Sequence, residues 1–231
     1  MADAASAYLA WWAQAGVDCA IGDAPVNWLR PANAAASVPA PEIVPTAKPE
    51  TLAAFRTWLA ADESQPERRW PGGAILPQGE AGASLMIVTD MPDPADMNAG
   101  SLLSDRAGQL FDAMLRAIGL ARADAYITSL FLSRPPGGMV EASDLTQAAE
   151  RMRTHVALAA PDRLLLLGDR TIRTLLSVQD KGGMDDLHFF NHDGGTVPVF
   201  ATFHPRLLLG QPAAKAECWR ILQGLIEEQD R

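Results

Sequence analysis

A single histidine stands directly after an apolar run near the end of the chain. The run covers residues 197–203, and it is followed by His204 and Pro205. Because proline has no amide hydrogen for a strand ladder, Pro205 helps to end a strand at this point. A lone imidazole in that position is presented at the carboxyl edge of a sheet, where α/β proteins bind their ligands. We therefore expect His204 to be a reactive group.

Two further polar segments follow apolar runs in the same way. Asp90 and Asp93 come after the run 84–88, and a segment from Ser129 to Arg134 ends the run 125–131. The carboxyl ends of parallel strands meet at one edge of a sheet. We therefore expect these segments to converge with His204 on one site.

The elements that must position these residues alternate along the chain, which predicts an α/β fold with a short, mostly parallel β-sheet sandwiched between helices. In the helix predicted over 106–119, for example, Leu110, Met114 and Ile118 share one face. Asp144 is a candidate helix cap, and residues 188–202 suggest a hairpin that contains the last strand. The expected strands are 84–88, 125–131, 163–167 and 197–202, and the expected helices are 51–61, 106–119, 144–159, 171–177 and 213–229.

The first 50 residues differ from the rest. Residues 31–50 are rich in alanine and proline and are expected to be a linker. They separate an N-terminal helical segment (1–30) from an α/β domain (51–231). The segment either packs onto the domain or docks a protein partner through Trp11, Trp12 and Trp28.

Composition limits the function classes. The chain has 231 residues, 48% hydrophobic content and a net charge of −9, which disfavours indiscriminate binding to nucleic acid. A local basic groove near His204 is still compatible with that charge. Cys19 and Cys218 are too few for a disulfide scaffold or an all-cysteine metal site. No leader and no membrane-spanning run is recognisable, so we expect a cytoplasmic protein without membrane contact.

The remaining acidic and histidine residues are weaker signals. Asp90, Asp93 and Asp96 lack the spacing of a calcium loop, and His188 and His192 lie at an expected hairpin. We expect no metal site. His155, between basic residues of an expected helix, is predicted to lie at the surface.

Several motifs resemble the uracil-DNA glycosylase superfamily, with the bacterial family-4 type as the nearest match. They are Thr89 to Pro94, Arg106 to Leu110, Tyr126-Ile127-Thr128, Arg134 to Gly137, and His204 to Arg206. The resemblance covers roughly residues 84–225. It implies an enzyme that flips a base out of the DNA stack and cleaves the bond between base and sugar.

The resemblance also implies roles for single residues. His204 matches the histidine that donates a hydrogen bond to the leaving base. Asp90 falls where the family has a glutamate in Gly-Glu-x-Pro-Gly, so it would position water or offset charge on the sugar. In that motif Pro92 is kept, but Asp93 replaces the last glycine.

Other matches depart further from the family. In the base pocket, Leu103 replaces a stacking phenylalanine, and Ser129 replaces the asparagine that reads uracil. The resemblance places four residues against DNA: Arg134, Pro205, Arg206 and Lys215. Ser133 and Ala148 occupy two positions at which family-4 enzymes hold a four-iron four-sulfur cluster with cysteines. We therefore expect no cluster and no other cofactor.

Three functions are compatible with these residues. The first is a divergent glycosylase of base-excision repair, acting on uracil or another damaged base in single- or double-stranded DNA. The second is a catalytically silent member of the family that serves as a DNA- or protein-binding module, which the altered pocket residues favour. The third is a binder of free nucleobases or nucleosides.

Overall fold

The computed structural model describes residues 2–15, 49–176 and 188–227, and the chain divides into two compact units after Ala47. Within the first unit, helix α1 (Ala2–Gln14) carries Trp12 edge-on against Tyr8 and Trp11. Most of the expected linker, together with Trp28 and Cys19, lies outside the described residues.

The second unit is built on a five-stranded sheet with the order β2-β1-β3-β5-β4. The four strands β2, β1, β3 and β5 are parallel, and β4 forms an antiparallel hairpin with β5. The strands are β1 (Met86–Thr89), β2 (Tyr126–Ser129), β3 (Leu164–Leu167), β4 (His188–His192) and β5 (Gly195–Thr202). The predicted fold class is confirmed.

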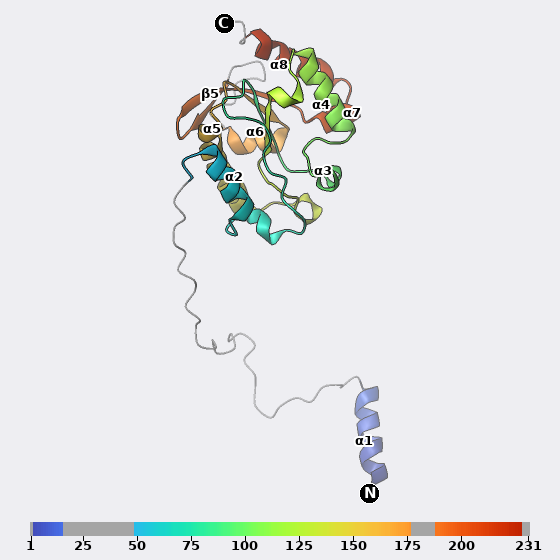
Figure 1. Ribbon diagram of the computed structural model, residues 1–231. Helices are drawn as coiled ribbons and strands as arrows, with labels where there is room; N and C mark the ends of the chain where they lie inside the picture. The colour runs from blue at the N-terminus through green and yellow to red at the C-terminus, as the bar shows by residue number, and fades with distance from the viewer. Residues whose placement is uncertain (1, 16–48, 177–187, 228–231) are drawn as a thin grey trace. The chain divides into compact units, whose positions relative to one another are not determined.

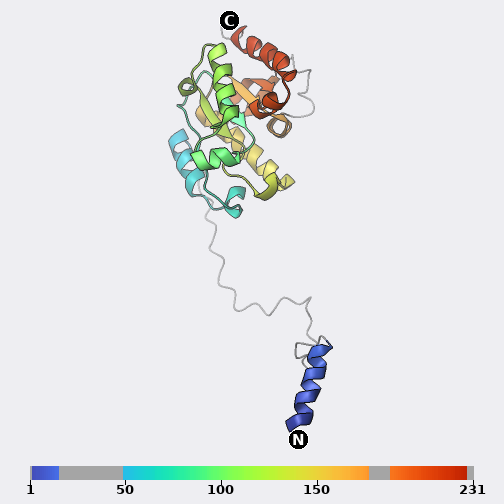
Figure 2. The ribbon, with the colours of Figure 1, turned by 90° about the vertical axis from the view of Figure 1, so that its right-hand side faces the viewer.

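Helices cover both faces of this sheet (Figure 1; Figure 2). Successive residues of β1 alternate between the faces: Met86 and Val88 pack with α5 and α6, whereas Ile87 packs with α4, α7 and α8. The helices are α2 (Leu52–Ala61), α3 (Pro94–Ala99), α4 (Arg106–Ala117), α5 (Ala142–Ala159), α6 (Asp169–Leu175), α7 (Pro205–Gly210) and α8 (Ala214–Glu227). No described helix has the length and apolar character needed to cross a membrane.

Two short helices were not expected from the sequence, and each begins at a proline. Pro94 starts α3 and Pro205 starts α7, because proline fits the first helical position, where no amide hydrogen is needed. Pro205 therefore has a second role beyond ending β5. It starts the helix that His204 caps.

Two expectations about α5 were wrong. Asp144 lies inside the helix and pairs with Arg69, whereas Glu141 is the N-cap residue. His155 is 2% exposed rather than at the surface, and its Nε2 lies 2.7 Å from the hydroxyl oxygen of Tyr126. The neighbouring Arg151 is also buried, and its charge is compensated by Glu67 at 2.6 Å. Basic neighbours in the sequence therefore did not mark a surface.

Candidate active site

A cavity of about 280 Å³ opens at the carboxyl edge of the sheet. It is bordered by the ends of β1 and β3, by the loop after β2, and by the start of α7. Its size is just below the usual range for small-molecule sites, about 300–1,000 Å³. The charged and titratable residues that line it are Asp90, Asp93, Arg134, Asp169, Arg170, His204 and Arg206.

His204 lies between the end of β5 and the start of α7. Its Nδ1 accepts a hydrogen bond of 3.2 Å from the backbone N–H of Arg206, which caps α7. Burial lowers the pKa of His204, against the opposing effect of Asp93, so the imidazole is neutral at pH 7. Because Nδ1 is an acceptor, the single ring proton of the neutral form lies on Nε2. His204 is therefore a hydrogen-bond donor.

Asp90 follows β1, and its two carboxylate oxygens have different surroundings. Oδ2 accepts a hydrogen bond of 2.8 Å from Nη1 of Arg170, and Oδ1 is buried without a partner among the described residues. Burial raises the pKa of Asp90, while Arg170 and Arg134 act in the opposite direction. Oδ1 therefore has unused acceptor capacity, although it is covered from solvent in the free protein.

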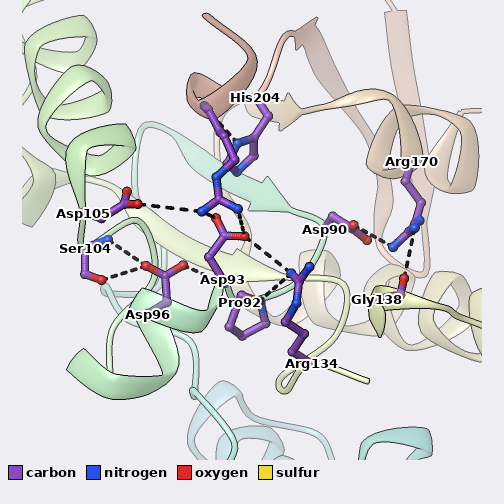
Figure 3. Close-up of polar contacts among 11 residues, drawn as sticks. Asp90, Pro92, Asp93, Asp96, Ser104, Asp105, Arg134, Gly138, Arg170 and His204 are labelled. Atoms are coloured by element: carbon purple, nitrogen blue, oxygen red, sulfur yellow. Dashed lines mark hydrogen bonds and ion pairs between the residues drawn. The ribbon is translucent and has the colours of Figure 1, made fainter. Parts of the chain in front are cut away.

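Asp93 pairs with two arginines that come from different elements, and Figure 3 shows its contact with one of them, Arg134. Its carboxylate pairs closely with Arg206 of α7, and its Oδ1 lies 3.4 Å from Nη1 of Arg134. Asp96 holds the backbone here, since it accepts hydrogen bonds from the N–H of Asp93 at 3.1 Å and from Ser104 at 2.8 Å. The negative charge at this position is therefore paired.

The structure brings only some of the predicted residues to the cavity. Pro92 lies beside it, where its carbonyl accepts a hydrogen bond of 3.3 Å from Arg134. Ser129 is buried at the end of β2, and its hydroxyl donates to the carbonyl of Phe131 at 2.7 Å. Leu103 packs into the core on the α4 face. Ser129 and Leu103 do not line the cavity, and neither do Pro205 and Lys215.

Arg170 is a residue of the site that the sequence reasoning missed. It lies in the first turn of α6, directly after β3, and it also donates to the carbonyl of Gly138 at 3.3 Å. The expected strand 163–167 contained the signal, because residues after its carboxyl end belong to the same sheet edge as Asp90 and His204.

Comparisons with known proteins agree with the resemblance found in the sequence. Residues 76–223 match the family model described as uracil DNA glycosylase superfamily. The type-4 uracil-DNA glycosylase of Pyrobaculum aerophilum is 24% identical over 159 residues, 66% of this chain and 81% of the relative. The type-4 enzymes of Archaeoglobus fulgidus and Saccharolobus solfataricus are 26% and 25% identical over 60% of this chain, covering 73% and 68% of their own lengths.

Proposed function

The chain belongs to the uracil-DNA glycosylase superfamily, and from this premise we propose that it hydrolyses the N-glycosidic bond of uracil or another damaged base in DNA. The observation that carries the proposal is the orientation of His204. The N–H of Arg206 occupies Nδ1, so the neutral ring keeps a donor at Nε2 beside the cavity.

A donor in this place suits the charge that develops in the reaction. As the bond between base and sugar breaks, negative charge gathers on the leaving base and positive charge on the sugar. The His204 Nε2–H stabilises the leaving base, as donors in oxyanion holes stabilise developing negative charge. The neutral imidazole can serve this role because its one ring proton lies on Nε2.

Asp90 serves the opposite charge in this proposal. Its carboxylate, which lines the cavity, offsets the positive sugar and accepts a hydrogen bond from the water that adds to the sugar carbon. Arg170 holds Oδ2 and thereby fixes the direction of Oδ1. Arg170 is a positioning residue because it acts through Asp90.

We further propose that the protein works without an iron–sulfur cluster. Ser133 and Ala148, at two of the positions where the resemblance implies cluster cysteines, are both buried and have no thiolate to offer. Within the described part of the chain, the hydroxyl of Ser133 has no hydrogen-bond partner. A buried ion pair supports this region instead: Glu67 accepts a hydrogen bond of 2.9 Å from the N–H of Leu132 and pairs with Arg151. Analysis of the purified protein for iron and acid-labile sulfide is expected to detect neither.

Asp93 favours a second candidate function, that of a catalytically silent DNA- or protein-binding module. A paired carboxylate narrows a cavity where the family resemblance implies a glycine. Helix α1 exposes Tyr8 and Trp11, and we propose that it binds a protein partner through them. The cytoplasmic location is likewise a prediction.

An excision assay separates the two functions. Labelled single- and double-stranded oligonucleotides with one uracil, hypoxanthine or xanthine are incubated with the protein, and strand scission at abasic sites is measured. We expect excision by the wild type and a loss of roughly 10²–10³-fold in His204→Ala. His192→Ala, at the end of the β4–β5 hairpin, is the matched control and should act like the wild type. If the folded wild type excises none of these bases, the silent module is favoured.

A further inference from the structure

We propose that Arg134 and Arg206 form a binding site for one phosphate group of the DNA backbone, and that Asp93 occupies this site in the free protein. The inference rests on the proposed function, because it assumes DNA as the ligand. It goes further in assigning the phosphate site and its internal competitor.

The geometry of the three residues carries the first step. Arg134 comes from the loop after β2 and Asp93 precedes α3 (Figure 3). Arg206 lies in the first turn of α7. The two guanidinium groups meet on one carboxylate oxygen, since both donate to Oδ1 of Asp93. Two convergent guanidinium groups from separate elements are a typical anion site, because their planar forks fit the oxygens of carboxylates and phosphates.

Exposure carries the second step. The side chain of Asp93 is 11% exposed, whereas those of Arg134 and Arg206 are 33% and 45% exposed. An anion from solution can therefore reach the arginines while the carboxylate is still covered. Asp93 shares its single negative charge between the two arginines, and Asp105 lies 3.8 Å from Arg206.

Position identifies the anion. Both arginines line the same cavity as His204. A flipped base enters such a cavity while it is still joined to its sugar and to the backbone phosphates on either side. A phosphate must then lie close to the mouth of the cavity, where these arginines are. The net charge of −9 repels DNA elsewhere, so local arginines are needed there.

Exchange of ion pairs follows from this arrangement. When a phosphate binds, the arginines must give up part of their pairing with Asp93, and this lowers the affinity for every DNA sequence alike. Removal of the Asp93 charge is therefore expected to strengthen DNA binding. Repulsion of DNA by the net charge of the protein alone predicts an equal gain from removal of any carboxylate.

The first experiment compares two neutralised carboxylates. Asp93→Asn keeps the size of the side chain. Asp112→Asn removes the same charge from another Asp–Arg pair, in which Asp112 of α4 lies 2.8 Å from Arg122 in the segment after that helix. Binding to a labelled single-stranded oligonucleotide without damaged bases is measured by fluorescence anisotropy at salt concentrations between about 50 and 200 mM. We expect Asp93→Asn to bind about three- to tenfold more tightly than the wild type. Asp112→Asn should change the affinity by less than about twofold.

A double-mutant cycle tests whether the gain comes from the arginines. Arg206→Gln is made in the wild type and in Asp93→Asn. The loss of DNA affinity caused by Arg206→Gln is expected to be larger in the Asp93→Asn background, because Asp93 no longer pairs with Arg206 there. Equal gains from Asp93→Asn and Asp112→Asn, or an additive cycle, would overturn the inference. Since undamaged DNA is the probe, this result does not depend on excision. A wild type that excises no base overturns the proposed catalysis alone.

Discussion

Nη1 of Arg170 lies 2.8 Å from Oδ2 of Asp90, so an ion pair joins the end of β1 to the first turn of α6 beside the cavity. Burial raises the pKa of Asp90, and Arg170 counteracts that effect. The pair therefore favours the ionised form of a carboxyl group whose pKa is raised overall, and it fixes the orientation of that group.

Arg170→Gln is expected to lower excision at neutral pH and to move its pH dependence. Without the guanidinium the pKa of Asp90 rises further, and since the ionised form is the active one, activity is lost at a higher pH as the solution is acidified. The loss at pH 7 should not exceed the roughly 10²–10⁴-fold that a positioned acid–base group contributes. The measurement is the pH profile of excision rate with saturating enzyme.

The conservative variant separates charge from packing. Arg170→Lys keeps a positive charge near Asp90, so the acidic limb of the profile should return toward that of the wild type. An acidic limb that stays in place in Arg170→Gln would contradict a role of Asp90 as the ionised group.

Gly168 has no side chain and thereby leaves room for His204 in its observed position. It has a φ of +91°, and a Cβ atom there would lie 3.3 Å from Cβ of His204. Gly168→Ala is expected to cost about 1–3 kcal/mol of unfolding free energy from backbone strain. Displacement of His204 should also reduce excision at least tenfold.

Gly119 is the matched control for this substitution. It has a φ of +76°, but a Cβ atom would meet nothing within 4 Å. Gly119→Ala should therefore be destabilised by roughly 1–2 kcal/mol without a loss of excision. The comparison uses urea denaturation and the excision assay on both variants. Equal loss of excision in the two variants would show that stability, and not the position of His204, limits the activity.

The sequence predicted the sheet edge well because its signals are local. Apolar runs mark the strands, and parallel strands bring their carboxyl ends together, so the order of residues alone assigned Asp90 and His204 to one site. The resemblance to the superfamily, which the family model confirms, implied roles for the residues around them.

Partners distant in the sequence could not be predicted in this way. Arg206 pairs with Asp93, 113 residues away, and nothing near either residue indicates the pair. His155 was assigned to the surface because Arg151 and Arg153 flank it, yet Arg151 is itself buried by Glu67, 84 residues away. Such pairs depend on the packing of whole elements, which spacing along the chain does not encode.

Removal of one partner of the buried Glu67–Arg151 pair is expected to destabilise the protein strongly. Arg151→Met leaves a buried carboxylate unpaired and should cost about 3–5 kcal/mol. The double variant Glu67→Leu/Arg151→Met removes both charges and should recover a large part of that loss, which urea denaturation at pH 7 would measure. A double variant as unstable as Arg151→Met alone would show that the backbone contacts of these side chains matter more than their charges.

His155 makes the stability of the protein sensitive to acid. Burial, with Arg151 and Arg56 nearby, lowers its pKa to about 3. The folded protein therefore holds His155 neutral, while the unfolded chain binds a proton near pH 6.5. The sign follows from this difference: the contribution of neutral His155 is fully present above about pH 6.5 and is lost as the pH falls toward 3.

His155→Gln should flatten this dependence, because glutamine does not titrate and can still hydrogen-bond the hydroxyl of Tyr126. Between pH 6.5 and pH 5 the wild type should lose about 1.5 kcal/mol more unfolding free energy than His155→Gln. His192→Gln, from the β4–β5 hairpin, should decline as the wild type does. If His155→Gln declines equally over this range, then other groups dominate the acid sensitivity. A wild-type His155 imidazole signal that titrates near pH 6.5 in NMR spectra would likewise contradict its burial as a neutral ring.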